Sequence, residues 1–174
     1  MKIKPIYIVN FLFIIIVIAL LFSPLRKVLE KMQSTNAQSQ FSTIDKLSDQ
    51  QYSIDLKGVN TQDVNFKEFK GKKIFLNYWG TWCPVCVEEM PEIQKLYEKK
   101  KNEIQFVLIY MKDDRASVEQ YLRKNNYSFP VYEAVSPIDA ALLARAFPTT
   151  FLIDEKGNVK EKIEGARDWA QLNF

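Results

Sequence analysis

The chain has 174 residues, with 24 Lys and Arg against 21 Asp and Glu, two cysteines and no histidine. This length suits one domain with an appendage. Charges of both signs are interspersed and the net charge is only +3, so nothing in the sequence indicates nucleic-acid binding. The lack of histidine excludes Ser–His and Cys–His hydrolase chemistry.

An apolar stretch over residues 6–22 follows Lys2 and Lys4 near the start of the chain. About 17 residues are enough for a short membrane-spanning helix or for the long core of a signal peptide. Because no small-x-small cleavage site follows closely, we expect residues 1–23 to be an uncleaved signal-anchor helix, with a cleaved signal peptide as the alternative. Positive charges lie on both sides of the stretch, so charge alone does not decide its orientation.

After this segment we expect a linker over residues 24–41 and one folded domain over residues 42–174, because a polar run there gives way to regular apolar patterning. Apolar or alternating runs predict strands over residues 52–56, 74–78, 104–111, 129–132, 149–153 and 159–163. Amphipathic patterns and end signals predict a helix that opens at Cys83 and ends near residue 101, and helices over 117–125 with Ser117 as N-cap and 137–146 with Pro137 in its first turn. A helical turn over residues 64–69 and a short helix from Asp168 complete the predicted elements.

The alternation of strands and helices predicts a sheet with a parallel centre. The two last strands are joined by a turn over residues 154–158 and add an antiparallel edge. The sequence therefore predicts an α/β fold in which helices flank a mixed central sheet.

The two cysteines, Cys83 and Cys86, lie three positions apart where a predicted buried strand meets a predicted helix. There they can close a disulfide within the first helical turn, and the helix dipole with its free N–H groups favours a thiolate on the first sulfur. This is the arrangement that a dithiol–disulfide exchanger needs. Two alternatives stay open: a metal site completed by carboxylates or a second chain, and a purely structural disulfide, which would gain little from so short a loop.

Two segments carry a resemblance to a known family: Asn77-Tyr78-Trp79-Gly80-Thr81-Trp82-Cys83-Pro84-Val85-Cys86 with Glu89 and Pro91, and Phe147-Pro148-Thr149-Thr150-Phe151-Leu152-Ile153-Asp154 with Gly157. They resemble the two signatures of the thioredoxin superfamily, and most closely its membrane-anchored TlpA/ResA-like branch. The resemblance covers residues 41–168. Within the branch, the Cys-Pro-Val-Cys motif and Arg167-Asp168-Trp169 are similar to the suppressor-of-copper-sensitivity D group.

The resemblance implies a thioredoxin fold in which Pro148 follows a cis peptide bond and lies against the Cys83–Cys86 disulfide. It also implies a single-pass protein of the bacterial cytoplasmic membrane, with the catalytic domain on the extracytoplasmic, periplasmic side. Cys83 is expected to be the exposed attacking thiolate, and Cys86 the more buried resolving thiol. Supporting roles around the pair are expected for Asn77, Trp79, Trp82, Pro84, Val85, Glu89, Phe147 and Pro148.

Trp82 is expected to cover the cysteines and Trp79 to support the core from behind. Pro84 fits the first helical position, where a missing N–H costs nothing. The backbone of Phe147 and Pro148 is expected to align an incoming chain as a short added strand.

The sequence departs from the thioredoxin pattern at two positions. Asn77 replaces the buried aspartate that assists proton transfer, and an amide cannot take that proton. Glu89 is the first candidate for a substitute and Glu88 the second, although either could simply be a carboxylate near a helix N-terminus. Phe147 is bulkier than the usual residue before the cis-proline, which could change the redox potential and the accepted partners or could serve packing alone.

The resemblance favours a reductase of disulfides in exported proteins, for example in cytochrome c maturation, recharged by a membrane electron donor of the DsbD/CcdA kind. A disulfide-donating oxidant or isomerase is the alternative enzyme, and a partner-docking or Cu(I)-binding module is the alternative outside enzymes. We expect no cofactor, no resident metal, no nucleic-acid partner and a monomer.

Overall fold

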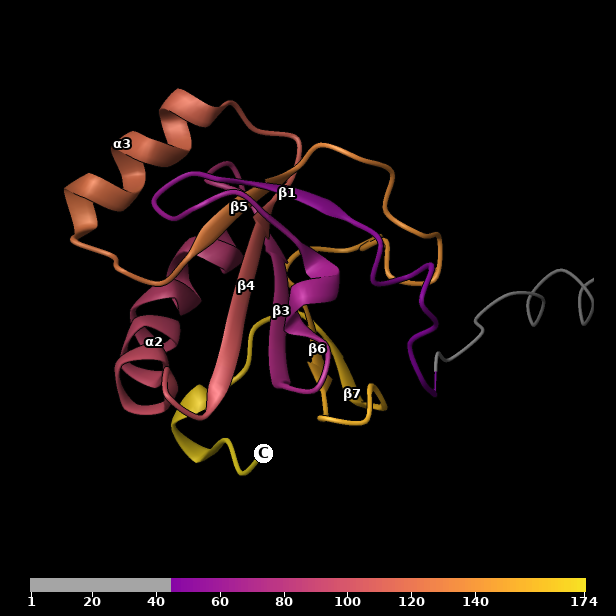
Figure 1. The fold of residues 1–174 in the computed structure, drawn as a ribbon. Helices are drawn as coiled ribbons and strands as arrows, with labels where there is room; N and C mark the ends of the chain where they lie inside the picture. Colours follow the sequence, from indigo (N-terminus) through magenta and orange to yellow (C-terminus); the bar gives the residue numbers. More distant parts are fainter. Residues whose placement is uncertain (1–44) are drawn as a thin grey trace, which may run out of the picture. The chain divides into compact units, whose positions relative to one another are not determined.

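A seven-stranded mixed sheet runs through the part of the chain that the computed structural model describes, residues 45–174 (Figure 1). In spatial order the strands are β2, β1, β5, β4, β3, β6 and β7. Their bounds are Asp55–Gly58 for β1, Val64–Asn65 for β2, Lys73–Trp79 for β3, Ile104–Tyr110 for β4, Val131–Ala134 for β5, Thr149–Ile153 for β6 and Val159–Glu164 for β7. The predicted signal-anchor and linker lie outside the described residues.

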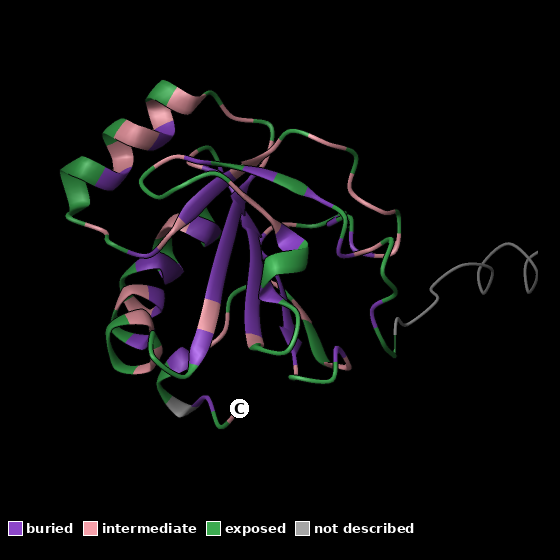
Figure 2. Cartoon of the chain, viewed as in Figure 1, coloured by how far each residue is buried: buried purple, intermediate pink, exposed green. Residues whose placement is uncertain are grey.

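The strands β3, β4 and β5 are parallel to one another, and β1, β2, β6 and β7 each pair antiparallel with their neighbours. The two central strands are nearly continuous apolar runs, as expected for strands that are buried on both faces. This confirms the predicted mixed sheet with a parallel centre and an antiparallel edge. Figure 2 shows the buried residues concentrated in these central strands.

Alternate residues of β3 belong to two separate hydrophobic clusters, because successive side chains of a strand point to opposite faces. Phe75 and Trp79 belong to the cluster that also holds apolar side chains of α2 (Pro84–Lys100), α3 (Arg115–Asn125) and the 3-10 turn η2 (Trp169–Gln171). Leu76 and Tyr78 belong to the other cluster, which η1 (Phe66–Phe69) and Leu142 help to form. Asn77 therefore points toward the α2 side of the sheet.

The predicted helix over residues 137–146 is wrong, because only an irregular segment with a single turn is present there. The backbone N–H groups of Leu142 and Leu143 both donate to the carbonyl of Asp139, at 2.9 Å each. The Asp139 side chain accepts the N–H of Ala141 at 3.0 Å, and such local side-chain bonds compete with helix formation. Leu142 is buried and Leu143 is exposed, so this segment packs on the core through a single turn and not through the face of a helix.

Several element boundaries differ from prediction for local reasons. The helix α3 begins at Arg115 and not at Ser117, because Asp114 is the N-cap and its side chain accepts the Ser117 N–H at 2.9 Å. The predicted strands over residues 52–56 and 129–132 are each shifted toward the C-terminus, to β1 and β5.

Among residues 45–174, none of the helices has both the length and the apolar character needed to cross a membrane.

Candidate active site

Cys83 and Cys86 form a disulfide at the point where β3 gives way to α2. Their Cα atoms are 5.3 Å apart, and the Cys83 sulfur accepts the backbone N–H of Cys86 at 3.2 Å. Cys83 is the N-cap of α2, and Pro84 occupies the first helical position, where no N–H is needed. The disulfide thus closes the first turn of the helix, with the first cysteine at the positive end of the helix dipole.

The expected exposure of Cys83 is not found in this disulfide form, where 5% of the residue is exposed. Its sulfur is turned into the first turn of the helix, where it bonds to Cys86 and accepts a backbone N–H. Cys86 is fully buried, so the expected order of accessibility of the two cysteines is retained. The neighbouring side chains of Trp82 and Val85 are 48% and 44% exposed.

Trp82, Val85, Phe147 and Lys112 form what we call the outer rim of the site. The indole of Trp82 lies edge-on to the ring of Phe147, with centroids 5.4 Å apart, and its N–H donates to the carbonyl of Met111 at 2.9 Å. The Lys112 ammonium lies 6.0 Å from the centroid of Phe147. A Cβ at Gly80 would overlap the Trp82 ring, so a glycine there permits this placement of the indole. Trp82 is thereby attached to two segments distant in sequence.

The Phe147–Pro148 peptide bond is cis, as the resemblance implies. Pro148 is buried, and its carbonyl accepts the N–H of Gly165 at 2.8 Å, which attaches the segment after β7 to the cis-proline loop. Phe147 is half-buried and packs against both hydrophobic clusters as well as Trp82. Phe147 therefore has a packing role. Its effect on the accepted partners or on the redox potential stays a prediction.

Asp113 is a site residue that the sequence interpretation missed. Its Oδ2 accepts both the backbone N–H of Thr81 at 2.6 Å and the Thr81 hydroxyl at 2.8 Å, which fixes the residue two places before Cys83. The predicted order of the strands could have indicated this position. Because β3 and β4 are parallel neighbours, with Trp79 opposite Tyr110, the residues that follow the two strands meet at one edge of the sheet.

Asn77, Glu89, Thr150 and Trp169 form a buried polar group on the α2 side of the sheet, which we call the inner cluster. The amide nitrogen of Asn77 donates to the Thr150 hydroxyl at 2.9 Å and to Oε1 of Glu89 at 3.4 Å. The indole N–H of Trp169 donates to Oε2 of Glu89 at 3.2 Å. Glu89 follows Cys86 by three residues on α2, so the two share a face of the helix.

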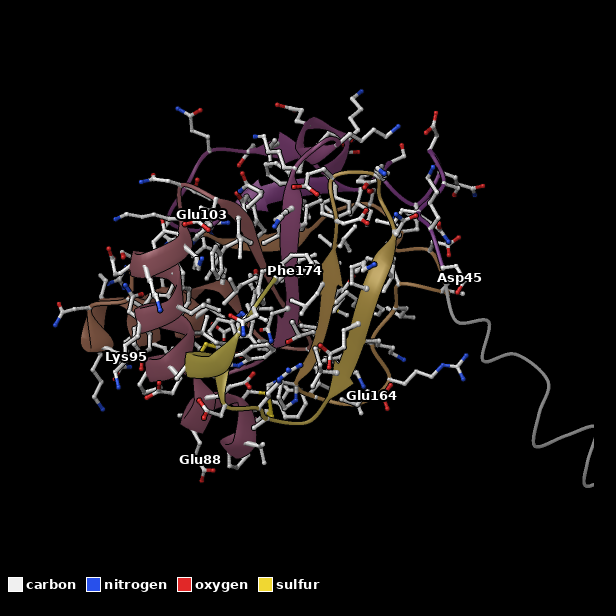
Figure 3. All side chains as sticks on the ribbon, turned by 90° about the horizontal axis from the view of Figure 1, so that it is seen from below. Asp45, Glu88, Lys95, Glu103, Glu164 and Phe174 are labelled. Atoms are coloured by element: carbon white, nitrogen blue, oxygen red, sulfur yellow. A yellow bond between two sulfur atoms is a disulfide. The ribbon has the colours of Figure 1, made fainter. Side chains whose placement is uncertain are left out.

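Burial raises the pKa of Glu89 to about 7, and hydrogen bonds from Trp169, from the backbone of Arg167 and from Asn77 act in the opposite direction. Such a carboxyl can gain or lose a proton near neutral pH, which is what a general acid or base needs. Glu88 is exposed and extends from α2 away from the rest of the molecule (Figure 3). Of the two carboxylates that the sequence offered, only Glu89 lies inside the site.

Trp79 is fully buried and packs against Tyr121, with ring centroids 5.6 Å apart, so it lies in the core and not on the outer rim. Within the described part of the chain, no three His, Cys, Asp or Glu side chains gather as a metal-binding group.

Known proteins resemble the chain in sequence and in fold. The Redoxin family model matches residues 36–172. A thiol-disulfide oxidoreductase ResA from Bacillus cereus is 35% identical over 120 residues, which are 68% of each chain. ResA from Geobacillus kaustophilus is 36% identical over 113 residues, 64% of this chain and 63% of that one.

Two solved structures show the same arrangement of elements. StoA from Bacillus subtilis aligns with a TM-score of 0.56 at 25% identity, over 67% of this chain and 90% of that one. A thioredoxin family thiol:disulfide interchange protein from Chlorobium tepidum aligns with a TM-score of 0.59 at 25% identity, over 71% and 92%. With its Cys83–Cys86 disulfide, the chain is a thiol–disulfide oxidoreductase of the ResA/DsbE type. It belongs to the Redoxin family, within the TlpA/ResA-like branch of the thioredoxin superfamily.

Proposed function

We propose that this oxidoreductase works as a reductase of protein disulfides on the extracytoplasmic side of a bacterial cytoplasmic membrane, with residues 1–23 as its signal-anchor. One observation carries the disulfide-exchange part of the proposal: one helical turn after Cys86, the partner of Cys83 in the disulfide, lies a buried carboxyl, Glu89, whose pKa is raised to about 7. A dithiol that must repeatedly lose and regain a proton near neutral pH needs such a group.

The reaction starts from the reduced dithiol. The Cys83 thiolate attacks one sulfur of the client disulfide, forms a Cys83–client mixed disulfide and releases the other client sulfur as a thiolate. Cys86 then passes its proton to Glu89, and the Cys86 thiolate attacks the Cys83 sulfur. The Cys83–Cys86 disulfide forms, the second client sulfur leaves as a thiolate, and two electrons have passed to the client.

The outer rim supplies the contacts with the client in this proposal. Trp82 and Val85 are exposed apolar side chains next to the cysteines, and the backbone before Pro148 offers a short edge for an added strand. Exported proteins with oxidised cysteine pairs, such as an apocytochrome c, are the proposed clients. A membrane protein of the DsbD/CcdA kind would return the two electrons.

The first test is the reduction potential of the Cys83–Cys86 pair, measured by equilibration of the full-length chain with thiol buffers. We expect a value near or below that of thioredoxin, about −270 mV, which makes the dithiol a reductant. A value near that of the oxidant DsbA, about −120 mV, would reverse the proposed direction of transfer.

A second test separates an enzyme from a docking module. Cys86→Ser should accumulate a stable mixed disulfide between Cys83 and the client, because the resolving thiol is missing, whereas Cys83→Ser should form none and lose all turnover. Non-reducing electrophoresis with mass spectrometry identifies the linked cysteine. Full client reduction by Cys83→Ser would exclude the proposed mechanism.

A further inference from the structure

One side chain of the C-terminal segment, that of Trp169, lies in the buried core next to the active site. Trp169 opens the short turn η2, after Asp168, whose side chain accepts the N–H of Ala170 at 2.9 Å. The Trp169 indole is fully buried and lies edge-on to Phe75, with centroids 4.8 Å apart. Its N–H ends on Oε2 of Glu89, at 3.2 Å. A residue 80 positions from Glu89 along the chain therefore touches the buried carboxyl directly.

The second fully buried tryptophan of this core shows that packing alone does not require that hydrogen bond. Trp79 belongs to the same hydrophobic cluster and is equally buried, yet its indole N–H has no hydrogen-bond partner among residues 45–174. The Trp169 indole thus combines the same apolar burial with a donor that is directed at a carboxylate.

The groups that face Glu89 are neutral donors. The amide of Asn77 reaches it from β3, the indole of Trp169 from η2 and the backbone N–H of Arg167 from the segment before η2. The Arg167 guanidinium lies elsewhere, 2.6 Å from Oε1 of Glu161 and 5.8 Å from the Trp169 ring. Within residues 45–174, no lysine or arginine side chain forms an ion pair with Glu89.

An ionised carboxylate in such surroundings depends on its hydrogen bonds. Each bond to a charged acceptor favours the ionised form, and a neighbour without an N–H leaves that form less stable. Of the two side-chain donors, the indole makes the shorter contact, 3.2 Å against 3.4 Å for the Asn77 amide.

We propose that Trp169 is a positioning residue of the active site: its indole N–H holds the ionised Glu89 carboxyl and so sets the pH range in which Cys86 can give up its proton. This rests on the proposed function, in which Glu89 receives that proton. The C-terminal segment is then part of the redox machinery and not only a cover for the sheet.

The test compares Trp169→Phe with the matched variant Trp79→Phe, both in the full-length chain. Each change removes the same part of a buried indole from the same cluster, but only the first removes a donor to Glu89. The titration of Glu89 is followed by carbon-13 NMR of labelled carboxyl groups and is assigned with Glu89→Gln. The midpoint in Trp169→Phe should move to higher pH by about one pH unit, and the midpoint in Trp79→Phe should stay in place.

The pH dependence of the resolving step gives the functional readout. In single-turnover experiments, formation of the Cys83–Cys86 disulfide from a mixed disulfide should slow about fivefold at pH 7 in Trp169→Phe and recover at higher pH. Equal movement of the Glu89 midpoint in both variants, or none in Trp169→Phe, would overturn the proposal. A Glu89 midpoint that moves in Trp169→Phe while the pH dependence of the resolving rate stays unchanged would also overturn it.

Failure of the proposed function would look different. If the wild-type chain reduces no protein disulfide, the NMR titration still reports whether Trp169 holds the carboxyl. Should Trp169→Phe not fold, site-specific replacement of Trp169 by benzothienylalanine keeps the bicyclic ring and removes only the N–H. An unmoved Glu89 midpoint in that protein would equally overturn the proposal.

Discussion

The two sides of the Cys83–Cys86 disulfide differ in chemistry and in the origin of their residues. The outer rim consists of exposed or half-exposed apolar side chains, Trp82, Val85 and Phe147, together with the cation Lys112. The inner cluster is fully or almost fully buried and polar, and hydrogen bonds join its members, which come from β3, α2, β6 and η2. The redox pair forms the boundary between them.

This difference separates two tasks that a thiol–disulfide oxidoreductase has to combine. Apolar side chains in contact with solvent suit recognition of varied protein surfaces, because their attraction is not directional. A buried, hydrogen-bonded carboxyl suits proton transfer, because burial brings its pKa toward the working pH. Changes in the inner cluster should therefore alter pH dependence, and changes in the outer rim should alter the KM for protein clients.

The largest effect is expected from Glu89→Gln in the inner cluster. The folded-state pKa of Glu89 is about 7, above its ordinary value of 4.5, so the folded protein binds more protons between these pH values. The free energy of unfolding should therefore fall as pH rises through that window, by roughly 3 kcal/mol in total. A glutamine side chain cannot ionise, so the variant should gain roughly that amount relative to wild type between pH 4 and pH 8.

Urea unfolding of the oxidised proteins at a series of pH values measures this difference. The matched control is Glu88→Gln, which removes an exposed carboxylate from the same turn of α2 and should change by less than about 0.5 kcal/mol over the range. A wild-type minus Glu89→Gln difference that is flat with pH would mean that Glu89 ionises like an exposed residue. The same variant should also resolve the mixed disulfide at least about tenfold more slowly at pH 7.

The next effect belongs to the outer rim. Trp82→Ala should raise the KM for a protein disulfide about tenfold, because a half-exposed indole beside the cysteines offers the largest apolar contact to a client. The rate with a small disulfide such as oxidised glutathione should change much less, within about twofold. Steady-state kinetics with both substrates measure the contrast, and Leu143→Ala removes an exposed apolar side chain that is outside the rim as a control.

A comparable loss with both substrates would contradict this division of tasks. It would indicate that Trp82 supports the geometry of the cysteines and not the docking of the client. The hydrogen bond from its indole to Met111 is the structural contact through which that support would act.

Local patterns explain which parts of this molecule could be predicted from the sequence. The strands β3, β4 and β6 could be predicted because each is a continuous apolar run, a pattern that is formed by residues adjacent in the sequence. The Cys-x-x-Cys motif at a helix start specifies its own disulfide and the Pro84 position for the same reason. Glu89 could be named because it belongs to the same local signature segment as the cysteines.

The features that escaped prediction depend on contacts between distant segments. The segment 137–146 has helix-like composition, yet Asp139 captures nearby N–H groups and Leu142 packs into a core formed by other elements. The hydrogen bond from Trp169 to Glu89 joins residues 80 positions apart. Asp113 meets Thr81 across 32 positions, through the pairing of two parallel strands.

The smallest effect is expected from Asp113→Ala, which tests whether the contact between Asp113 and Thr81 connects the two sides of the disulfide. Asp113→Ala removes one acceptor that receives two donors from Thr81, just before Trp82 and Cys83. We expect a loss of about 1 kcal/mol in stability and about a threefold fall in the rate of Cys83 alkylation or client attack, because the loop before the nucleophile becomes less ordered. Stopped-flow mixing with a thiol reagent and with a client measures both rates.

Conservative variants decide between a hydrogen-bond role and a charge role for Asp113. In Asp113→Asn the amide oxygen can still accept both donors from Thr81 and only the bond from the Asp114 N–H to Oδ1, 3.0 Å, is lost, so the rates should stay near those of wild type. Thr81→Val loses only the hydroxyl bond and should lie between wild type and Asp113→Ala. If Asp113→Asn behaves like Asp113→Ala, the negative charge and not the hydrogen bonds would be what matters at this position. The β4–α3 loop would then influence Cys83 electrostatically, and Asp113 would share with the inner cluster the control of sulfur ionisation.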